Sequence, residues 1–457
     1  MGAATTQQAQ LSVTGSQWIM KDIDERHVLH LQQKQGVSEL VARVLALRDI
    51  SVDEADDFLH PSLKAYLPDP YHLLDMDKAV QRIAHAIVDG QTIAVFGDYD
   101  VDGATSTSLL LRYFQQIGAH TLFHIPDRMT EGYGPNGPAL ERLKQRGADV
   151  CITVDCGTLA FEALEHAQKV GLDMVVIDHH LSSETMPPAH AVVNPNRLDQ
   201  DSEHGYMAAV GVCFLFLVAL NSYLKKKKYF DETPIPNLLT LLDIVALGTV
   251  CDVVPLIKAN RAFVSQGLKV MKSRQNVGLA ALADAAAITE EPGVYHLGYV
   301  LGPRINAGGR VGKSDLGTKL LTHADYHEAM EYAKQLDQYN AERKAIEQCV
   351  LDEAKLKAQA LPEDIPMVMV AGNDWHPGVI GIVAGRIKEI YHKPTAVISI
   401  DDNGIGKASA RSIAGIDLGS AIVAANQAEI LEAGGGHAMA AGFTVKQEKI
   451  DQLHQFL

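Results

Sequence analysis

The order of apolar and polar positions predicts an α/β fold from about residue 78 onward. Short apolar runs of strand length alternate with longer segments that carry apolar residues at helical spacing. This alternation is typical of a parallel sheet with helices on both faces, in which ligands gather at the carboxyl ends of the strands. The predicted strands span residues 92–97, 120–125, 150–154 and 173–177, and the helices between them span residues 104–117, 138–146 and 159–170.

A long charged segment separates this region from a second one of the same kind. Residues 324–360 favour helix and contain no glycine or proline, and a helix of that length often bridges two domains. Beyond it, strands are predicted at residues 367–371, 395–400 and 440–445, with a helix at 378–390. The expected fold class is therefore α/β, with two α/β domains that have parallel-rich sheets and are joined by a long helix.

Four segments follow from this pattern. They are a helical lead-in (1–75), a first α/β domain (76–323), the connecting helix (324–361) and a second α/β domain (362–457). The chain ends inside an amphipathic segment, which suggests a fragment of a longer protein. No role is assigned to the residues before about Trp18.

The composition is that of a globular enzyme without a membrane span. The most apolar run, residues 208–220, is shorter than a span requires and predicts a buried helix. The N-terminus lacks the basic start and apolar core of a secretion signal. Five cysteines without a CxxC pair indicate reduced thiols. We therefore expect a cytoplasmic protein with no membrane partner.

The net charge of −16 argues against a broad nucleic-acid-binding surface. A protein that grips nucleic acid usually presents a basic face, so such a face must be local here. The lysine run at residues 225–228 is interpreted as a solvated helix end. Carboxylates that serve as metal ligands would explain part of the negative charge.

Acids and histidines follow three of the predicted strands. Asp98, Asp100 and Asp102 follow the first strand, Asp155 follows the third, and His179 belongs to an Asp-His-His triplet after the fourth. A single aspartate after a strand usually caps a helix. Several carboxylates packed together repel one another unless a cation is present. Because the ends of parallel strands lie side by side, we expect these side chains to converge on metal.

Asp252, which follows an apolar helix, completes the expected ligand set. Oxygen ligands with one or two imidazoles suit Mn²⁺ or Mg²⁺ better than a structural zinc site. Two such ions, about 3.5–4 Å apart, can activate a water and stabilise the leaving oxygen of a phosphoryl displacement. Gly103 is expected to let the chain turn tightly into the helix after the first strand.

Nine segments resemble the DHH phosphoesterase superfamily, which is named after the triplet found here at residues 178–180. Within it, they closely match the branch of exonucleases that degrade single-stranded DNA from the 5′ end. The segments are GDYDVDGAT (97–105), PDRMTEGYG (126–134), VDCG (154–157), DHH (178–180), GTVCDVVPL (248–256), GPRINAGGR (302–310), WHPGVIGIVAGR (375–386), SAR (409–411) and GGGHAMAAGF (434–443).

The resemblance implies roles for the residues at the strand ends. His180 is expected to face the scissile phosphate and assist the leaving group, and Asp178 to orient a histidine. Asp155 is expected to bridge two ions. The implied metal ligands are Asp98, Asp100, Asp102, Asp155, His179 and Asp252.

The resemblance also implies a set of substrate-binding residues. Arginine forks suit the oxygens of a terminal phosphate, although a single arginine more often forms an ion pair. Backbone N–H groups of residues 434–436 are expected to form an anion nest, and His376 is equally explained by a structural turn. The set is Arg128, Arg304, Asn306, Arg310, His376, Ser409, Arg411, Gly435, Gly436 and His437.

The implied activity is two-metal hydrolysis of single-stranded DNA from the 5′ end, with release of 5′ mononucleotides, in DNA repair and recombination. The implied partners are single-stranded DNA, a single-strand-binding protein and a helicase, and a monomer is expected. The OB-fold that full-length relatives carry is expected to be absent. Two alternatives stay open: a phosphodiesterase for short oligonucleotides or cyclic dinucleotides, and a non-catalytic DNA-binding scaffold.

Overall fold

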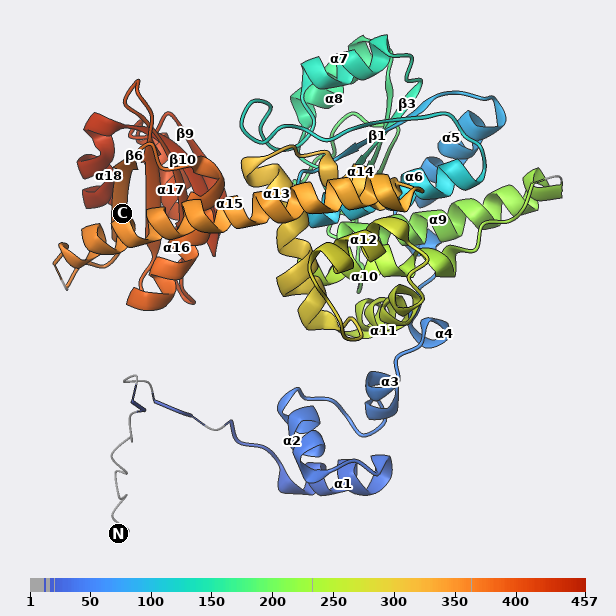
Figure 1. Cartoon of the computed structure of the whole chain (residues 1–457), viewed down its shortest axis with the longest axis horizontal. Helices are drawn as coiled ribbons and strands as arrows, with labels where there is room; N and C mark the ends of the chain where they lie inside the picture. The colour runs from blue at the N-terminus through green and yellow to red at the C-terminus, as the bar shows by residue number, and fades with distance from the viewer. Residues whose placement is uncertain (1–11, 14–16, 20, 232, 363) are drawn as a thin grey trace.

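The protein, seen here as a computed structural model, consists of four parts that follow one another along the chain (Figure 1). The structure describes residues 12–13, 17–19, 21–231, 233–362 and 364–457. A small helical unit precedes a large α/β domain, the long helix α15 (Tyr326–Gln359) and a smaller α/β domain. Most of the segment before Trp18 lies outside the described residues.

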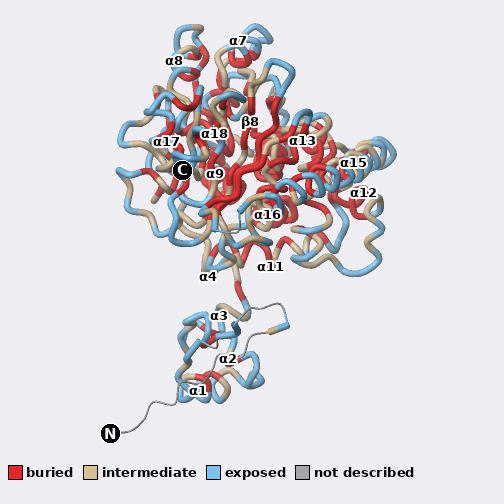
Figure 2. The backbone as a smooth tube through the Cα atoms, turned by 90° about the vertical axis from the view of Figure 1, so that its left-hand side faces the viewer, coloured by how far each residue is buried: buried red, intermediate tan, exposed pale blue. Residues whose placement is uncertain are grey.

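The first three helices form a small unit set apart from the body of the protein (Figure 2), whereas Leu63 and Tyr66 of the fourth pack against the first domain. The side chains of Asp24 and Ser38 cap the unit's first two helices, and a small apolar core of its own holds it together. Arg261 of the large domain anchors it, because the guanidinium carbon lies 3.9 Å from the centroid of the Phe58 ring. The helices are α1 (Glu25–Gln35), α2 (Glu39–Leu47), α3 (Ala55–Leu59) and α4 (Leu63–Tyr66).

The first domain contains a parallel five-stranded sheet in the order β2-β1-β3-β4-β5. Ile93 and Val95 of β1 belong to one apolar core with α5, α6 and α9, whereas Ala94 and Phe96 belong to another with α7 and α8. Helices therefore cover both faces, as predicted. The strands are β1 (Ile93–Gly97), β2 (Thr121–His124), β3 (Val150–Val154), β4 (Asp173–Ile177) and β5 (Ala191–Val193), which was not predicted. The helices are α5 (Met76–Val88), α6 (Val101–Gln116), α7 (Gly137–Gln145), α8 (Phe161–Lys169) and α9 (Ala209–Lys226).

Helix α9 is long and apolar enough to cross a membrane, but it is a core helix of this domain. Of its residues, 67% are buried, and it packs against α5 and α6. The prediction of a buried helix over residues 208–220 is confirmed. The lysines at 225–228 are exposed at its C-terminal end, as predicted for a solvated helix end.

A helical layer completes the first domain. Helix α10 ends directly before Asp252, and the π-helix η4 packs against it: the Cys251 thiol donates to the Leu297 carbonyl oxygen at 3.3 Å. The short helical turns are η1 (Pro70–His72), η2 (Tyr229–Asp231) and η3 (Leu238–Leu241), and the longer elements are α10 (Leu242–Cys251), α11 (Lys258–Lys272), α12 (Val277–Ala285), η4 (His296–Leu301), α13 (Gly302–Val311) and α14 (Leu316–Thr322).

The second domain is also α/β, as predicted, but its sheet is mixed rather than parallel-rich. The strand order is β6-β7-β8-β10-β9, and only β6 and β7 run parallel. The reason is the short turn between β7 and β8, because a connection of a few residues joins antiparallel strands only. The elements are β6 (Val368–Asn373), α16 (Pro377–Tyr391), β7 (Thr395–Ile400), β8 (Ile405–Arg411), α17 (Leu418–Gln427), β9 (Ala433–His437), β10 (Ala440–Lys446), η5 (Gln447–Lys449) and α18 (Ile450–Phe456).

Helix α15 runs along both domains (Figure 1). It packs against α12 and α13 of the first domain and against α16 and β6 of the second. Arg343 and Glu347 are buried near its middle. Cys349 on this helix is exposed, whereas the other four cysteines are buried or half-buried, and all five are free thiols, as expected.

Candidate metal centre

The carboxyl ends of β1, β3 and β4 lie next to one another in the sheet. The register pairs Gly97 with Val154 and Val154 with Ile177, so the residues that follow each strand begin side by side. Asp155 has a left-handed φ of 60°, and its backbone N–H donates to the Ile177 carbonyl oxygen at 3.1 Å. This conformation turns the chain out of the strand direction at the point where the acids gather.

The donor atoms of the acids and histidines form three overlapping groups. Within each group, the donor atoms lie within 4.8 Å of one another. Asp155 belongs to two of the groups and His179 to two. The groups are Asp98, Asp100 and Asp155; Asp102, His179 and Asp252; and Asp155, His179 and His180. The structure therefore brings all six predicted ligands together, with Asp155 shared between groups.

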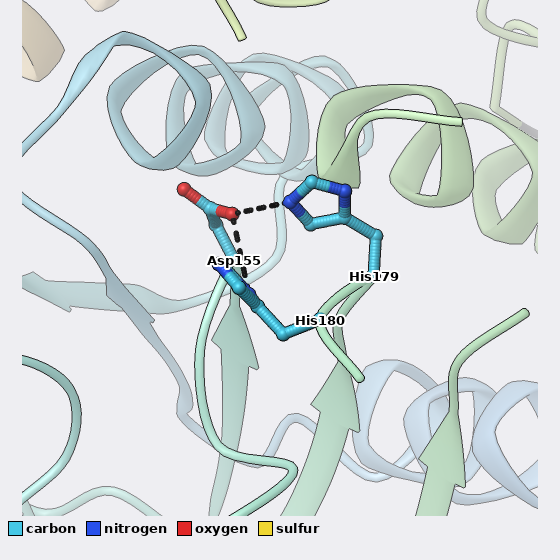
Figure 3. A group of neighbouring side chains, drawn as sticks. All are labelled: Asp155, His179 and His180. Carbon is cyan, nitrogen blue, oxygen red and sulfur yellow. Dashed lines mark ion pairs between the residues drawn. The ribbon is translucent and has the colours of Figure 1, made fainter. Parts of the chain in front are cut away.

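The two histidines approach the same carboxylate (Figure 3). Asp155 Oδ1 lies 3.2 Å from His179 Nε2 and 4.0 Å from His180 Nδ1. His179 Nδ1 lies 3.1 Å from the Met207 carbonyl oxygen and 3.7 Å from Asp252 Oδ2. A proton on Nδ1 that is donated to Met207 leaves the Nε2 lone pair free, which is the tautomer that a metal ligand needs.

Burial and mutual repulsion act against charge on these carboxylates. Burial raises the pKa of Asp98, Asp102 and Asp155 well above the ordinary value, and the charge of Asp100 raises each further. Burial and Asp100 also raise the pKa of Asp252 to about 7. A divalent cation would offset both effects, because it replaces the lost hydration and neutralises the repulsion.

Three buried atoms that could bind a metal have no hydrogen-bond partner among the described residues. They are Asp98 Oδ1, His179 Nε2 and Asp252 Oδ2. Asp102, by contrast, is fixed by the N-terminus of α9, whose first two N–H groups donate to its carboxylate at 2.6 and 2.9 Å. Unpaired buried polar atoms are costly, and a set of oxygens with imidazole suits Mn²⁺ or Mg²⁺. The residues present therefore fit the expected cofactor.

Gly103 supports this loop through its small size. It lies inside α6, so the expectation of a tight glycine turn is wrong. A Cβ atom at this position would lie 2.4 Å from the Asp98 carbonyl oxygen and 2.5 Å from the Asp98 nitrogen. The missing side chain allows the first turn of α6 to approach the Asp98 backbone.

Asp178 is buried and orients the second histidine. Its carboxylate accepts the His180 Nδ1 proton at 2.8 Å and the backbone N–H groups of Thr158, His179 and His180 at 3.0, 2.7 and 3.2 Å. Burial alone would raise the pKa of Asp178, but the hydrogen bonds from His180 and Thr158 lower it. Burial alone would lower the pKa of His180, but Asp178 raises it to about 9. His180 is therefore held in place as a proton donor.

Cations from both domains lie beside the acids. The Arg128 guanidinium carbon lies 5.2 Å from the centroid of the Tyr99 ring. Burial and the charge of Arg128 lower the pKa of both Arg411 and His376. Burial, and then the neighbouring arginines, lower the pKa of Arg310 to about 10. Ser409 joins them, because its hydroxyl accepts from Arg411 Nη1 at 3.1 Å. We call Arg128, Arg310, His376, Ser409 and Arg411 the interdomain basic cluster.

Arg304 and Asn306 of α13 were predicted to bind substrate, but they are not part of the interdomain basic cluster. Arg304 Nε donates to Asp337 Oδ1 at 2.9 Å, and Nη1 donates to the Val300 carbonyl oxygen at 2.7 Å. The guanidinium is therefore held against α15, as in an ordinary structural ion pair. Asn306 is half-buried on the same helix.

The glycine run forms a strand rather than an anion nest. Gly435 and Gly436 lie in β9, which pairs antiparallel with β10. The predicted nest is wrong, because successive N–H groups of a strand point in opposite directions and cannot converge on one anion. His437 ends β9 and lines a cavity together with His180.

Two site residues were missed by the sequence reasoning. The Tyr133 hydroxyl donates to the Asp155 carbonyl oxygen at 3.1 Å and lies 3.4 Å from both His180 ring nitrogens. The EGYG segment was the available signal for Tyr133. Arg343 is a buried neighbour of Arg310 on α15, and a helix charged on all sides gave no signal for it.

Two family models match the chain, one in each α/β domain. The DHH family, N-terminal domain, matches residues 92–249, and the DHHA1 domain matches residues 364–457. The first match contains the three strand ends that carry the acids and histidines.

Curated relatives extend the likeness along the chain. The single-stranded-DNA-specific exonuclease RecJ of Salmonella typhimurium is 37% identical over 408 residues, which are 87% of this chain and 70% of the relative. This chain belongs to the RecJ family. The RecJ of Bacillus subtilis is 36% identical over 447 residues, which are 96% of this chain. This RecJ-family chain spans about half (54%) of the length of that relative.

Solved RecJ structures share the fold and contain metal. RecJ from Thermus thermophilus in complex with Mn²⁺ matches with a TM-score of 0.78 at 31% identity, over 94% of this chain and 60% of that chain. The same organism's RecJ in complex with Mg²⁺ matches with a TM-score of 0.71 at 29% identity, over 94% and 58%. The cofactor expected for this RecJ-family site, Mn²⁺ or Mg²⁺, is the metal that these structures hold.

Proposed function

We propose that this chain hydrolyses phosphodiester bonds of single-stranded DNA from the 5′ end and releases 5′ mononucleotides. The observation that carries the proposal is the meeting of acids and an imidazole from three adjacent strand ends and α10, in groups that overlap at Asp155 and His179. The relatives that are named single-stranded-DNA-specific exonucleases support the substrate, and the arginines of the interdomain basic cluster, which suit a terminal phosphate, support the 5′ end. DNA repair and recombination are the processes that such an activity would serve.

The metal ligands of the proposal are six of the seven residues of the overlapping groups, all except His180. Asp155 would be the ligand shared by both ions, as the family resemblance implies, and its membership of two groups supports this role. When bound, two divalent ions supply positive charge for the attacking and leaving oxygens of an in-line displacement. The ligands are Asp98, Asp100, Asp102, Asp155, His179 and Asp252.

His180 serves the leaving group in this proposal. Water attacks phosphorus and gives up a proton to the solvent, the bond from phosphorus to the 3′ oxygen breaks, and His180 donates a proton to that oxygen. Asp178 holds the imidazole at 2.8 Å, and the Tyr133 hydroxyl touches it from another element. Asp178 and Tyr133 are therefore positioning residues.

The interdomain basic cluster binds the 5′-terminal phosphate in this proposal. Three arginines from two domains gather there, and arginine forks suit phosphate oxygens. Burial and then the charge of Arg128 lower the pKa of Arg310 and Arg411, and a bound anion would offset that repulsion. From the second domain, His437 and the edge strand that contains Gly435 and Gly436 contact the DNA backbone.

We also propose bounds for the domains, a location in the cell and protein partners. The DHH domain spans residues 76–323 after a lead-in (1–75), the connecting helix spans 324–361, and the DHHA1 domain spans 362–457. The chain acts as a cytoplasmic monomer. A helicase and a single-strand-binding protein are its proposed partners, because an exonuclease for single strands needs strands that are already separated.

Digestion of single strands labelled at either end, with Mn²⁺ present, tests the proposal. A 5′ label should appear at once as mononucleotide, while a 3′ label should stay in shortening strands. Asp155→Asn should lower turnover by more than roughly 100-fold, because loss of an outer-shell partner alone costs roughly 10–100-fold. Asp352→Asn, which changes an exposed acid on α15, is the matched control and should keep full activity.

Three outcomes would refute the proposal or redirect it. Equal rates on duplex DNA would remove the strand preference, and release from the 3′ end alone would reverse the direction. Faster cleavage of a dinucleotide than of a long strand would instead indicate a short-oligonucleotide phosphodiesterase.

A further inference from the structure

A cavity lies beside His180, where the two domains meet. Its volume is about 260 Å³, which is below the roughly 300–1,000 Å³ of pockets that take drug-sized ligands. It therefore has room for one nucleobase and not for a base pair. The wall is formed mainly by Tyr133, Pro135, Leu159, His180, Leu181 and His437.

Large apolar side chains in this wall face water. Tyr133, Leu159 and Leu181 are 55%, 57% and 62% exposed. Single exposed leucines are ordinary, but three large apolar groups beside the buried Asp178 and the partly exposed His180 mark a ligand-binding surface. Because the faces of nucleobases stack on aromatic and apolar side chains, this wall suits a base.

The side chains of Asp178 and Thr158 in the cavity wall already form hydrogen bonds within the protein. Asp178 accepts its four hydrogen bonds from Thr158, His179 and His180. The Thr158 hydroxyl accepts the Asn194 amide at 2.9 Å. Few groups remain to read the edge of a base, so a base would bind by stacking and apolar contact without sequence preference.

The cavity also lies close to the interdomain basic cluster. The ring of Tyr133 meets the ring of Tyr99 edge-on, with centroids 6.4 Å apart, and Arg128 lies 5.2 Å from the centroid of Tyr99. A strand whose 5′ phosphate meets Arg128 therefore brings its first nucleotide next to Tyr133 and His180.

We propose that this cavity holds the base of the 5′-terminal nucleotide while the bond on its 3′ side is cleaved. This inference rests on the proposed exonuclease function and deepens it. It also gives a physical reason for single-strand selectivity, because a base that is paired to a complementary strand does not fit. Stacking on Tyr133 and contact with Leu159 and Leu181 would hold the nucleotide until His180 releases it.

Oligothymidylates with one abasic site test the assignment on the unaltered protein. The abasic site stands at the first, the second or a distant position, and the release of the first nucleotide is measured with Mn²⁺. We expect the KM to rise roughly ten-fold for the first position, in line with the loss of one stacked base. The second and distant positions should leave the KM close to that of the intact strand.

Leucine variants test whether this cavity causes the rise in KM for the strand with an abasic site at the first position. Leu159→Ala and Leu181→Ala should each raise the KM of the intact strand and shrink the penalty of the first-position abasic site, since the two changes remove the same interaction. A purely structural defect would affect both substrates equally. Leu356→Ala, at a 69% exposed leucine of α15 outside the cavity, should change neither value.

The outcomes separate this inference from the proposed function. If the protein digests single strands from the 5′ end but shows no penalty at the first position, or an equal one at the second, the cavity assignment fails alone. If no strand is digested from the 5′ end, both fail together.

Discussion

The pKa of a buried carboxyl group depends on which groups surround it. Asp178 and Asp155 are equally buried, at 1% and 3% exposure. Hydrogen-bond donors surround Asp178 and lower its pKa, whereas other acids surround Asp155 and raise its pKa. A bound cation would therefore stabilise the charged form of Asp155, whereas Asp178 is already stabilised by hydrogen bonds.

Asp243 allows a test of burial without the complication of metal. Burial raises its pKa from 3.8 to about 6, and the charge of Arg112 lowers it only in part. The folded state therefore keeps a proton that the unfolded state loses, and stability falls as the pH rises from about 4 to about 6. Asp243→Asn should be more stable than the wild type at pH 7.5, by on the order of 3 kcal/mol.

The gain from Asp243→Asn should shrink towards zero as the pH approaches 4. Urea denaturation of both proteins at several pH values measures the difference. A gain that is the same at every pH, or a less stable variant at pH 7.5, would contradict the assigned pKa.

At the scale of elements, the site depends on how closely α6 approaches the end of β1. Gly103→Ala should force the Asp98 backbone away, because a Cβ atom has only 2.4 Å to the Asp98 carbonyl oxygen. We expect weaker Mn²⁺ binding and roughly 10–100-fold lower activity, as for other supports of metal ligands. Calorimetric Mn²⁺ titration measures the first effect.

Gly385→Ala is the matched control for this prediction. Gly385 lies in α16, and a Cβ atom there meets nothing within 4 Å. Alanine should be tolerated there and even favour the helix by about 1 kcal/mol. Equal loss of Mn²⁺ binding in both variants would mean that close packing at Gly103 is unimportant.

The sequence predicted the elements whose side chains make a periodic pattern. β1, β3 and β4 are mostly apolar runs that acids or histidines follow, so a metal site at their ends could be predicted from the residues. The full set of six proposed ligands, with Asp98 included, came from the family resemblance. β8 was missed because Ser409 and Arg411 interrupt its run of apolar residues. β9 was missed because it consists mainly of glycines. These strands form through backbone pairing with β10, which leaves no hydrophobic signature. Arg343 was missed because only the fold places it beside Arg310.

At the scale of the whole molecule, an ion-pair network joins α15, the helix that runs along both domains, to the second domain. Glu347 pairs with Arg343 on the same helix and with Arg386 of the second domain, at 2.6 Å for the latter. Arg343 Nη2 also donates to the Asn340 side chain at 2.9 Å. One carboxylate therefore neutralises two arginines at the domain boundary.

Glu347→Gln should destabilise the protein by about 3–5 kcal/mol, because it leaves the buried Arg343 charge unpaired. Thermal unfolding followed by circular dichroism measures the loss. Glu342→Gln removes the same charge from an exposed site of the same helix and should leave the unfolding temperature almost unchanged. Similar unfolding temperatures for the two variants would argue against a structural role of the network.

The single exposed thiol on the connecting helix has a practical use. A maleimide dye should attach at Cys349 in preference to the four shielded cysteines. Because α15 touches both domains, the emission of that dye would respond when an oligonucleotide enters between them. The natural sequence thus carries its own labelling position for fluorescence studies of strand loading.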